Sequence, residues 1–264
     1  MTKRFLLILM LSSPIFTFAQ TQENSYFSLT VGGGLAGAKT SSESSTIANA
    51  RLGQTYKQYN DSVQSFQSTR INYSATLWYH HIINSELTLQ TGLGYVDMGW
   101  RREQNNLNYG DFTYPGVGDG RIIENSNTSK NINYDYRFHY LQIPVWINYL
   151  AFKSKDFKTT YSFTGGLTGN VLLKHALTAR LDGFNLDSKS KFQLDSTGYD
   201  ARIFNMQFNV GLRVEHKLEK NITAIIQPMF SIHPLSATKD PISANLYGMM
   251  LHVGLVLSLD MFDE

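Results

Sequence analysis

Hydrophobic and polar residues alternate along much of the chain with a period of two. In the clearest case, Phe204 to Glu215, large apolar residues alternate with amides, glycine and charged residues. Successive side chains of a β-strand point to opposite faces, so this pattern predicts a strand with one apolar and one polar face. The alternation alone fits two opposite placements, because the apolar face can line the core of a soluble barrel or face lipid around a polar lumen.

Eight segments with this strand-like character are each long enough to cross a bilayer, which takes about 9–11 residues of a tilted strand. We expect strands over Tyr26–Ala36, Arg70–His80, Glu86–Met98, Tyr134–Leu150, Phe157–Leu173, Ala201–Leu218, Asn221–His233 and Asn245–Phe262.

The connections between these segments alternate strictly in length. Those after the second, fourth and sixth strands are short, at 82–85, 151–156 and 219–220. Those after the first, third, fifth and seventh strands are longer, at 37–69, 99–133, 174–200 and 234–244. Short periplasmic turns and longer extracellular loops are typical of outer-membrane barrels, and an even strand number leaves both termini periplasmic. The sequence therefore predicts an all-β fold, an eight-stranded antiparallel up-and-down transmembrane β-barrel, with a soluble barrel around an apolar ligand cavity as the alternative.

The first 19 residues are typical of a secretory signal peptide. Lys3 and Arg4 precede an apolar stretch, Phe5 to Phe16, and small residues precede a cleavage site after Ala19. We therefore divide the chain into a signal peptide, 1–19, and a barrel domain, 20–264. Cleavage would leave basic and acidic residues equal in number, so nothing indicates a nucleic-acid partner. The chain has no cysteine, which excludes disulfides, thiolate metal sites and a cysteine nucleophile.

Aromatic residues gather near the ends of the expected strands, where barrels carry interfacial girdles. The expected girdle consists of Tyr79, Tyr95, Trp100, Tyr134, Tyr136, Tyr140, Tyr149, Tyr247 and Phe262.

The polar faces of the strands would fill the interior, because eight strands enclose a lumen just wide enough for side chains. An Arg213–Glu215 pair on one face would be a structural ion pair, since charges shielded from water must be paired. We expect a polar network in the lumen made by Gln90, Gln142, Asn205, Gln207, Asn209, Arg213, Glu215, Gln227 and His252.

The fourth segment contains Tyr140-Leu-Gln-Ile-Pro-Val-Trp-Ile-Asn-Tyr149. It resembles the tyrosine–leucine–(acid or amide)–isoleucine–proline–hydrophobic signature of the PorT-like outer-membrane β-barrel family of the Bacteroidetes. Gln90-Thr-Gly-Leu-Gly-Tyr95 and Asn209-Val-Gly-Leu-Arg213 are similar to glycine-containing strands of that family. The resemblance implies an eight-stranded barrel in the outer membrane and, as one possible role, an accessory factor of type IX-like protein secretion. Gln142 stands where the family often has an acid.

Catalytic and metal-binding patterns are weak. Adjacent His80 and His81 point to opposite faces of a strand, so they cannot share a metal there. Ser231 and His233 share a face, with Asp240 in the following loop, and this is the best available arrangement for a lipid-modifying enzyme at the rim. His139 and His175 are also expected near that rim.

We therefore expect no catalytic residue, no metal and no cofactor. The protein would be a non-enzymatic, monomeric barrel in the outer membrane, acting through extracellular loops in binding, adhesion or envelope structure. Its partners would be outer-membrane lipid and envelope or secretion proteins. A secretion factor and a rim-located lipid-modifying enzyme are the alternatives.

Overall fold

The computed structural model describes residues 25–49, 53–107, 130–181, 192–193, 200–219, 222–239 and 241–257. The expected signal peptide, Asp240 and Phe262 lie outside the described residues. The wall consists of eight long antiparallel strands: β1 (Ser25–Ser41), β5 (Arg70–Ile82), β6 (Leu87–Leu107), β7 (Lys130–Lys153), β8 (Thr159–Leu181), β10 (Phe204–Lys217), β11 (Ile222–Ile232) and β12 (Ser243–Leu257). All eight overlap the expected segments, although β1, β6, β7 and β8 extend further and β10 starts later, at Phe204.

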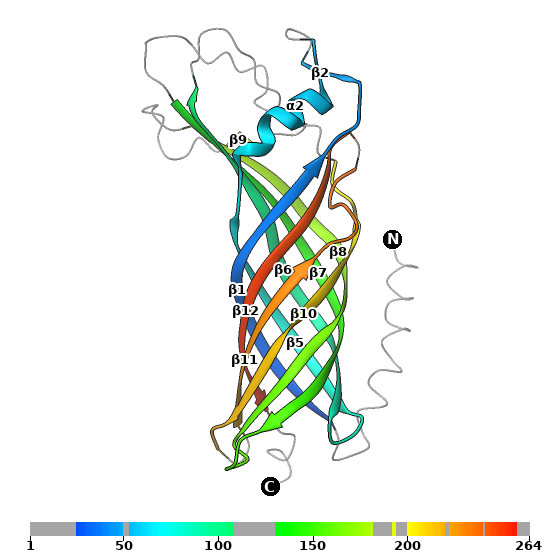
Figure 1. Ribbon diagram of the computed structural model, residues 1–264, viewed down its shortest axis with the longest axis vertical. Helices are drawn as coiled ribbons and strands as arrows, with labels where there is room; N and C mark the ends of the chain where they lie inside the picture. Colours follow the sequence, from blue (N-terminus) through cyan, green and yellow to red (C-terminus); the bar gives the residue numbers. More distant parts are fainter. Residues whose placement is uncertain are drawn as a thin grey trace, which may run out of the picture.

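The eight strands close into a ring. Their order is β10-β11-β12-β1-β5-β6-β7-β8, and β8 also pairs with β10 from Phe204↔Val171 to His216↔Thr159. Each long strand is thus bonded on both sides around the ring, which removes the strand edges there. The loop-end parts of β6 and β8 extend past β5 and β10. The two-residue strands β4 (Gln67–Ser68) and β9 (Phe192–Gln193) extend this sheet beside β6 and β8. The predicted all-β barrel is confirmed (Figure 1).

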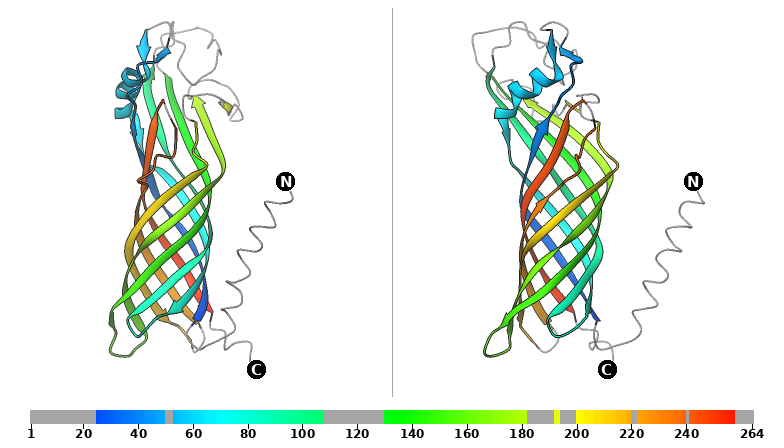
Figure 2. Two further views of the ribbon diagram at one scale, coloured as in Figure 1. Left: turned by 90° about the vertical axis from the view of Figure 1, so that its right-hand side faces the viewer. Right: turned by 45° about the vertical axis from the view of Figure 1, so that its right-hand side comes forward.

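The barrel has two different ends, which we call the turn end and the loop end. At the turn end β5 leads into β6, β7 into β8 and β10 into β11, and the described chain starts and stops there (Figure 1). The loop end carries a small hairpin, β2 (Ile47–Asn49) with β3 (Gln54–Thr55), helix α2 (Tyr56–Val63) and the 3₁₀ turn η2 (Gln64–Phe66) (Figure 2).

Helix α2 was not predicted. Its start is fixed by a capping box in which the Thr55 hydroxyl accepts a bond from the Gln58 amide while the Gln58 side chain accepts one from the Thr55 amide. None of the helices in the described part of the chain is long and apolar enough to cross a membrane.

Large apolar side chains cover the outside of the barrel. In β10, Val210 is 60% exposed while Arg213, on the opposite face, is 1% exposed. The apolar face of this strand therefore points outward and its amides point inward. We call the outward residues the apolar belt; it includes Leu29, Val31, Leu77, Leu93, Ile143, Val145, Ile147, Phe163, Leu167, Phe208, Val210, Leu212, Ile226, Phe230, Leu251, Val253 and Leu255.

The interior becomes apolar towards the loop end. There the inward residues of β6 and β7 form a stacked group, with Trp100 on Tyr136 at 4.4 Å between ring centroids and 8° between planes. We call the buried residues of this part the inner apolar cluster: Ala38, Val96, Met98, Trp100, Tyr134, Tyr136, Phe138, Tyr140, Leu177, Ala201, Ala237, Ala244, Leu246 and Met250.

The prediction of the aromatic girdle is therefore wrong for four residues. Trp100, Tyr134, Tyr136 and Tyr140 are buried inside the barrel rather than exposed on its outer surface. Tyr149 and Tyr247 do lie on the outside, each about half exposed, and Tyr79 and Tyr95 are partly exposed. The difference arises because β6 and β7 continue past the belt, where the interior needs an apolar core of its own.

Candidate functional site

The amides of the expected lumen network lie inside the barrel and bond to one another. Gln142 donates to Asn170 at 3.0 Å and to Gln207 at 3.2 Å. Gln207 donates to Asn209 at 2.7 Å, and Asn209 donates to the Thr168 hydroxyl at 3.0 Å. This chain of bonds links the inner faces of the neighbouring strands β7, β8 and β10, so these buried amides satisfy one another.

A second group of expected residues lies nearer the turn end. Arg213 Nε donates to Glu215 at 2.6 Å, and Arg213 Nη1 reaches Gln227 at 3.4 Å. Gln90 bonds instead to His80 at 3.0 Å, and His80 bonds to the Ser28 hydroxyl at 2.7 Å. The nine expected residues are therefore divided among separate groups.

Two expected members take no part in these side-chain bonds. Asn205 Oδ1 accepts a bond from the Met206 amide, and its Nδ2 has no partner in the described part of the chain. His252 meets the Trp146 ring edge-on at 6.2 Å, and its Nδ1 likewise has no partner among the described residues.

Two tryptophans that the sequence reasoning missed block the middle of the lumen. Trp78 and Trp146 meet at 4.5 Å between ring centroids, and Met229 packs against them. Their indole nitrogens donate to the hydroxyls of Thr30 at 2.9 Å and Thr168 at 3.0 Å. In the sequence both tryptophans lie on the polar faces of their strands, in line with His80 and Asn148. That position could have predicted that they point into the lumen.

Each end of the barrel has a cavity. The cavity at the turn end measures about 390 Å³ and reaches Tyr26, Arg213 and Glu215, so the ion pair lies at its inner limit. The cavity at the loop end measures about 830 Å³ and is mainly polar; it is lined by Ser41, Ser42, Glu43, Ser44, Thr46, Tyr56, Pro241 and Ser243. The Ser42 hydroxyl donates to the Pro241 carbonyl at 2.5 Å, which ties the two sides of the loop-end cavity together.

The Ser231–His233 pair does not form a catalytic arrangement in the described residues. The Ser231 hydroxyl donates to the Gly248 carbonyl at 3.4 Å, and neither ring nitrogen of His233 has a partner among the described residues. Burial lowers the pKa of His233 to about 3, so the imidazole is neutral at ordinary pH. A general base needs its nucleophile within hydrogen-bond reach, and that contact is missing here.

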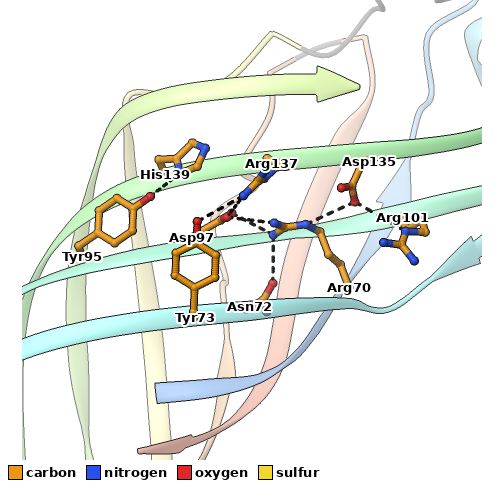
Figure 3. Close-up of polar contacts among 9 residues, drawn as sticks. All are labelled: Arg70, Asn72, Tyr73, Tyr95, Asp97, Arg101, Asp135, Arg137 and His139. Atoms are coloured by element: carbon orange, nitrogen blue, oxygen red, sulfur yellow. Dashed lines mark hydrogen bonds and ion pairs between the residues drawn. The ribbon is translucent and has the colours of Figure 1, made fainter. Parts of the chain in front are cut away.

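A cluster of charged residues lies on β5, β6 and β7 (Figure 3), on the loop-end side of the belt residue Leu93. Asp97 accepts two bonds from Arg70, at 2.9 and 3.0 Å, and a further one from Arg137. Arg137 also donates to the Tyr73 hydroxyl at 3.3 Å. Asp97 has the same orientation as Leu93 in β6, so an acid stands on the face that carries the belt, yet it is 0% exposed.

An interruption of the β5–β6 pairing lets Arg70 join this cluster. The strands pair at Ser68↔Arg101 and again at Tyr73↔Asp97, and between these pairs residues 69–72 lie opposite residues 98–100. The additional residue on the β5 side is a bulge, which re-aims side chains at sheet edges and barrel rims. Arg70 Nε also lies 3.3 Å from Asp135 Oδ1, so one guanidinium is shared between two carboxylates (Figure 3).

The profile of the outer membrane protein beta-barrel domain family matches residues 18–237. The chain belongs to this family. Membership places the protein in the outer membrane and settles the orientation left open by the alternation, because the apolar belt then faces lipid. A search of curated proteins found no match.

Several solved outer-membrane barrels are similar to this chain at low sequence identity. Neisserial surface protein A is 12% identical, with a TM-score of 0.37, over 89% of this chain and 99% of that one. The outer membrane protease OmpT from Escherichia coli is 9% identical, with a TM-score of 0.38, over 90% and 99%. Ail, the attachment invasion locus protein of Yersinia pestis, solved in complex with the heparin analogue sucrose octasulfate, is 9% identical, with a TM-score of 0.33, over 88% and 99%. At these TM-scores the likeness carries no argument about fold or function.

Proposed function

We propose that this protein is a non-enzymatic outer-membrane barrel that acts through its loop end, as a binding or adhesion surface, and does not conduct solutes. The observation that carries the proposal is the packing of the lumen. The Arg213–Glu215 pair, the Trp78–Trp146 contact and the inner apolar cluster occupy successive levels of the interior. With the interior filled, the surface open to other molecules is that of the two ends and the outer wall.

The loop end supports a binding role better than the turn end does. It holds the larger cavity, and helix α2 with its hairpin gives that cavity an ordered wall. Backbone bonds from Tyr56 to the Thr46 carbonyl and from Lys57 to the Ser44 carbonyl hold the helix start against the segment 42–46. The longer connections lie at this end, which supports our proposal that this end lies outside the cell and that both termini are periplasmic.

Conductance and adhesion together test this proposal. The purified barrel in a planar lipid bilayer should show no stepwise conductance, and replacing residues 42–66 by a short turn should leave that result unchanged. Cells that display the protein should aggregate with one another or bind to a glycan array, and the loop replacement should abolish this. Trp78→Phe is the control variant. It changes the lumen and leaves the loop end intact, so adhesion should be unchanged. Porin-like conductance steps, or adhesion that survives the loop replacement, would contradict the proposal.

The PorT-like resemblance supports a second candidate, an accessory role in type IX-like secretion. It rests on the Tyr140–Tyr149 signature and on the turn-end cavity, which would face periplasmic partners. A deletion strain distinguishes the two roles, because a secretion factor would leave secreted proteins accumulated in the periplasm. A lipid-modifying enzyme is the least supported candidate, and an unchanged lipid A mass in a Ser231→Ala strain would exclude that use of the pair.

A further inference from the structure

Cations follow the apolar belt directly on the outer wall of β7 and β8. The belt side of this border is the pair Leu141↔Val171, and the next outward pair towards the loop end is His139↔Lys174, followed by Arg137↔Ala176. Arg137 and Lys174 occupy diagonal positions on neighbouring strands, about 7–8 Å apart at their backbones, so their long side chains can reach one ligand. Tyr95, opposite Leu141, and Tyr73 mark the same border.

Immediately beside the belt the acid Asp97 is covered, whereas the cations Arg137 and Lys174 reach the surface. Asp97 is 0% exposed beneath Arg70 and Arg137, while Arg137 is 33% exposed and Lys174 is exposed. Asp135 and Glu103 lie further towards the loop end, where they neighbour Arg101. The surface next to the belt is therefore positive, although the cluster as a whole contains both signs.

Hydrogen-bond donors remain available in this row. Both bonds that Arg137 makes to Asp97 and Tyr73 use Nη2, so its Nη1 makes no hydrogen bond to the part of the chain that the structure describes. His139 bonds through Nδ1 to the Tyr95 hydroxyl at 2.5 Å, which leaves Nε2 on the other side of the ring. A guanidinium, an ammonium and an imidazole at neighbouring outward positions suit an anion with several oxygens.

We propose that Arg137, Lys174 and His139 bind the phosphate of a membrane lipid headgroup in the leaflet at the loop end. The acyl chains of such a lipid would lie along Leu141, Val171 and the belt below, and its phosphate would lie at the height of the cation row. Asp97 is a positioning residue, because it holds Arg137 against the wall through their ion pair. The site rests on the outer-membrane location and is independent of the proposed loop-end function.

Lipid retention in detergent tests the site. The full-length folded protein is stripped of lipid in neutral detergent and mixed with dioleoyl phosphatidic acid or with dioleoyl phosphatidylcholine, and bound lipid is counted by native mass spectrometry. Phosphatidic acid, with its phosphate monoester, should bind more tightly than phosphatidylcholine. The Arg137→Gln/Lys174→Gln double variant should weaken phosphatidic acid binding by about tenfold or more, as expected for two lost charge-assisted bonds, and leave phosphatidylcholine unchanged.

A matched control removes two cations from the opposite end. Lys153 and Lys158 are exposed at the turn end of β7 and in the following turn, so Lys153→Gln/Lys158→Gln changes the net charge equally and should not alter retention. Lys174→Gln alone breaks no ion pair found in the described residues, so it keeps the test valid if the Arg137 variant does not fold. Equal losses in both double variants, or no loss in either, would overturn the proposal. Displacement of the lipid by excess inorganic phosphate would also overturn it, in favour of a site for free anions.

Discussion

The same two strands, β6 and β7, have opposite polarity in their turn-end and loop-end halves. In the turn-end half Leu93 points outward and is 55% exposed, while Gln90 points inward and is buried. In the loop-end half Asp97 has the outward orientation and Trp100 is buried inside. The backbone keeps its alternation throughout; what changes is which face is apolar. The barrel thus consists of a membrane part and, towards the loop end, a part with a polar outer surface and an apolar interior, as in a soluble barrel.

The two halves are stabilised differently because their surroundings differ. In the membrane part lipid surrounds the wall, so the outward residues are apolar. Polar groups inside this part are stabilised by hydrogen bonds to one another, as in Gln142, Gln207 and Asn209. In the part above, water surrounds the wall, and the hydrophobic effect favours an apolar interior. The border between Tyr95 and Asp97 on β6 is therefore the height at which the lipid should end.

The largest effect is expected from a truncation inside the loop-end half. Trp100→Ala would remove a fully buried ring stacked on Tyr136, and its cavity should lower the free energy of unfolding by about 3–5 kcal/mol. Leu93→Ala, on the lipid side, should cost far less because lipid refills the space. Urea titration in lipid vesicles, followed by circular dichroism, measures both. Similar losses for the two variants would mean that the inner apolar cluster is no core.

The sequence predicted the closed barrel and the orientation of Phe204–Glu215 from alternation and loop lengths. It did not locate the change of polarity, because a girdle aromatic and a core aromatic have the same strand period. Trp100 and Tyr136 were therefore assigned to the outer surface. The signal was present in their neighbours, since Asp97 and Arg137 are charged residues on the otherwise apolar faces of β6 and β7. The contacts of Arg70 were beyond prediction because they depend on a bulge in the pairing.

Arginines introduced at two heights on the outer wall would locate the border between the membrane part and the loop-end part. Leu93→Arg puts a charge within the belt and should cost about 2–4 kcal/mol, whereas Leu173→Arg, beside the cation row, should cost about 0–1 kcal/mol. Both leucines are more than half exposed, so packing losses are similar. Folding into vesicles, measured by the heat-dependent gel shift, gives the order. A Leu173→Arg cost as large as that of Leu93→Arg would move the lipid border towards the loop end.

Acid should weaken the loop-end half through His233. Burial lowers the pKa of His233 to about 3, below the value of about 6.5 expected in the unfolded chain, so the unfolded state binds more protons between these values. The stabilisation is full above pH 6.5 and declines as the pH falls, by about 2 kcal/mol between pH 6.5 and pH 5 for one proton. His233→Gln should flatten this part of the pH profile of urea unfolding. An unchanged profile in the variant would show that His233 is accessible to protons in the folded state.

The smallest effect is expected at the surface edge of the charged cluster. Arg101 lies 3.7 Å from both Asp135 and Glu103 and is 40% exposed, and such solvent-screened pairs contribute about 0–1 kcal/mol. Arg101→Gln should therefore leave the urea midpoint nearly unchanged. Arg70→Gln should lower the midpoint clearly, because the covered Asp97 would then be paired with Arg137 alone. The contrast depends on burial, because both residues are arginines paired with aspartates on the same wall. Equal losses of stability in the two variants would mean that Asp97 is hydrated in the folded protein and is not covered by Arg70 and Arg137.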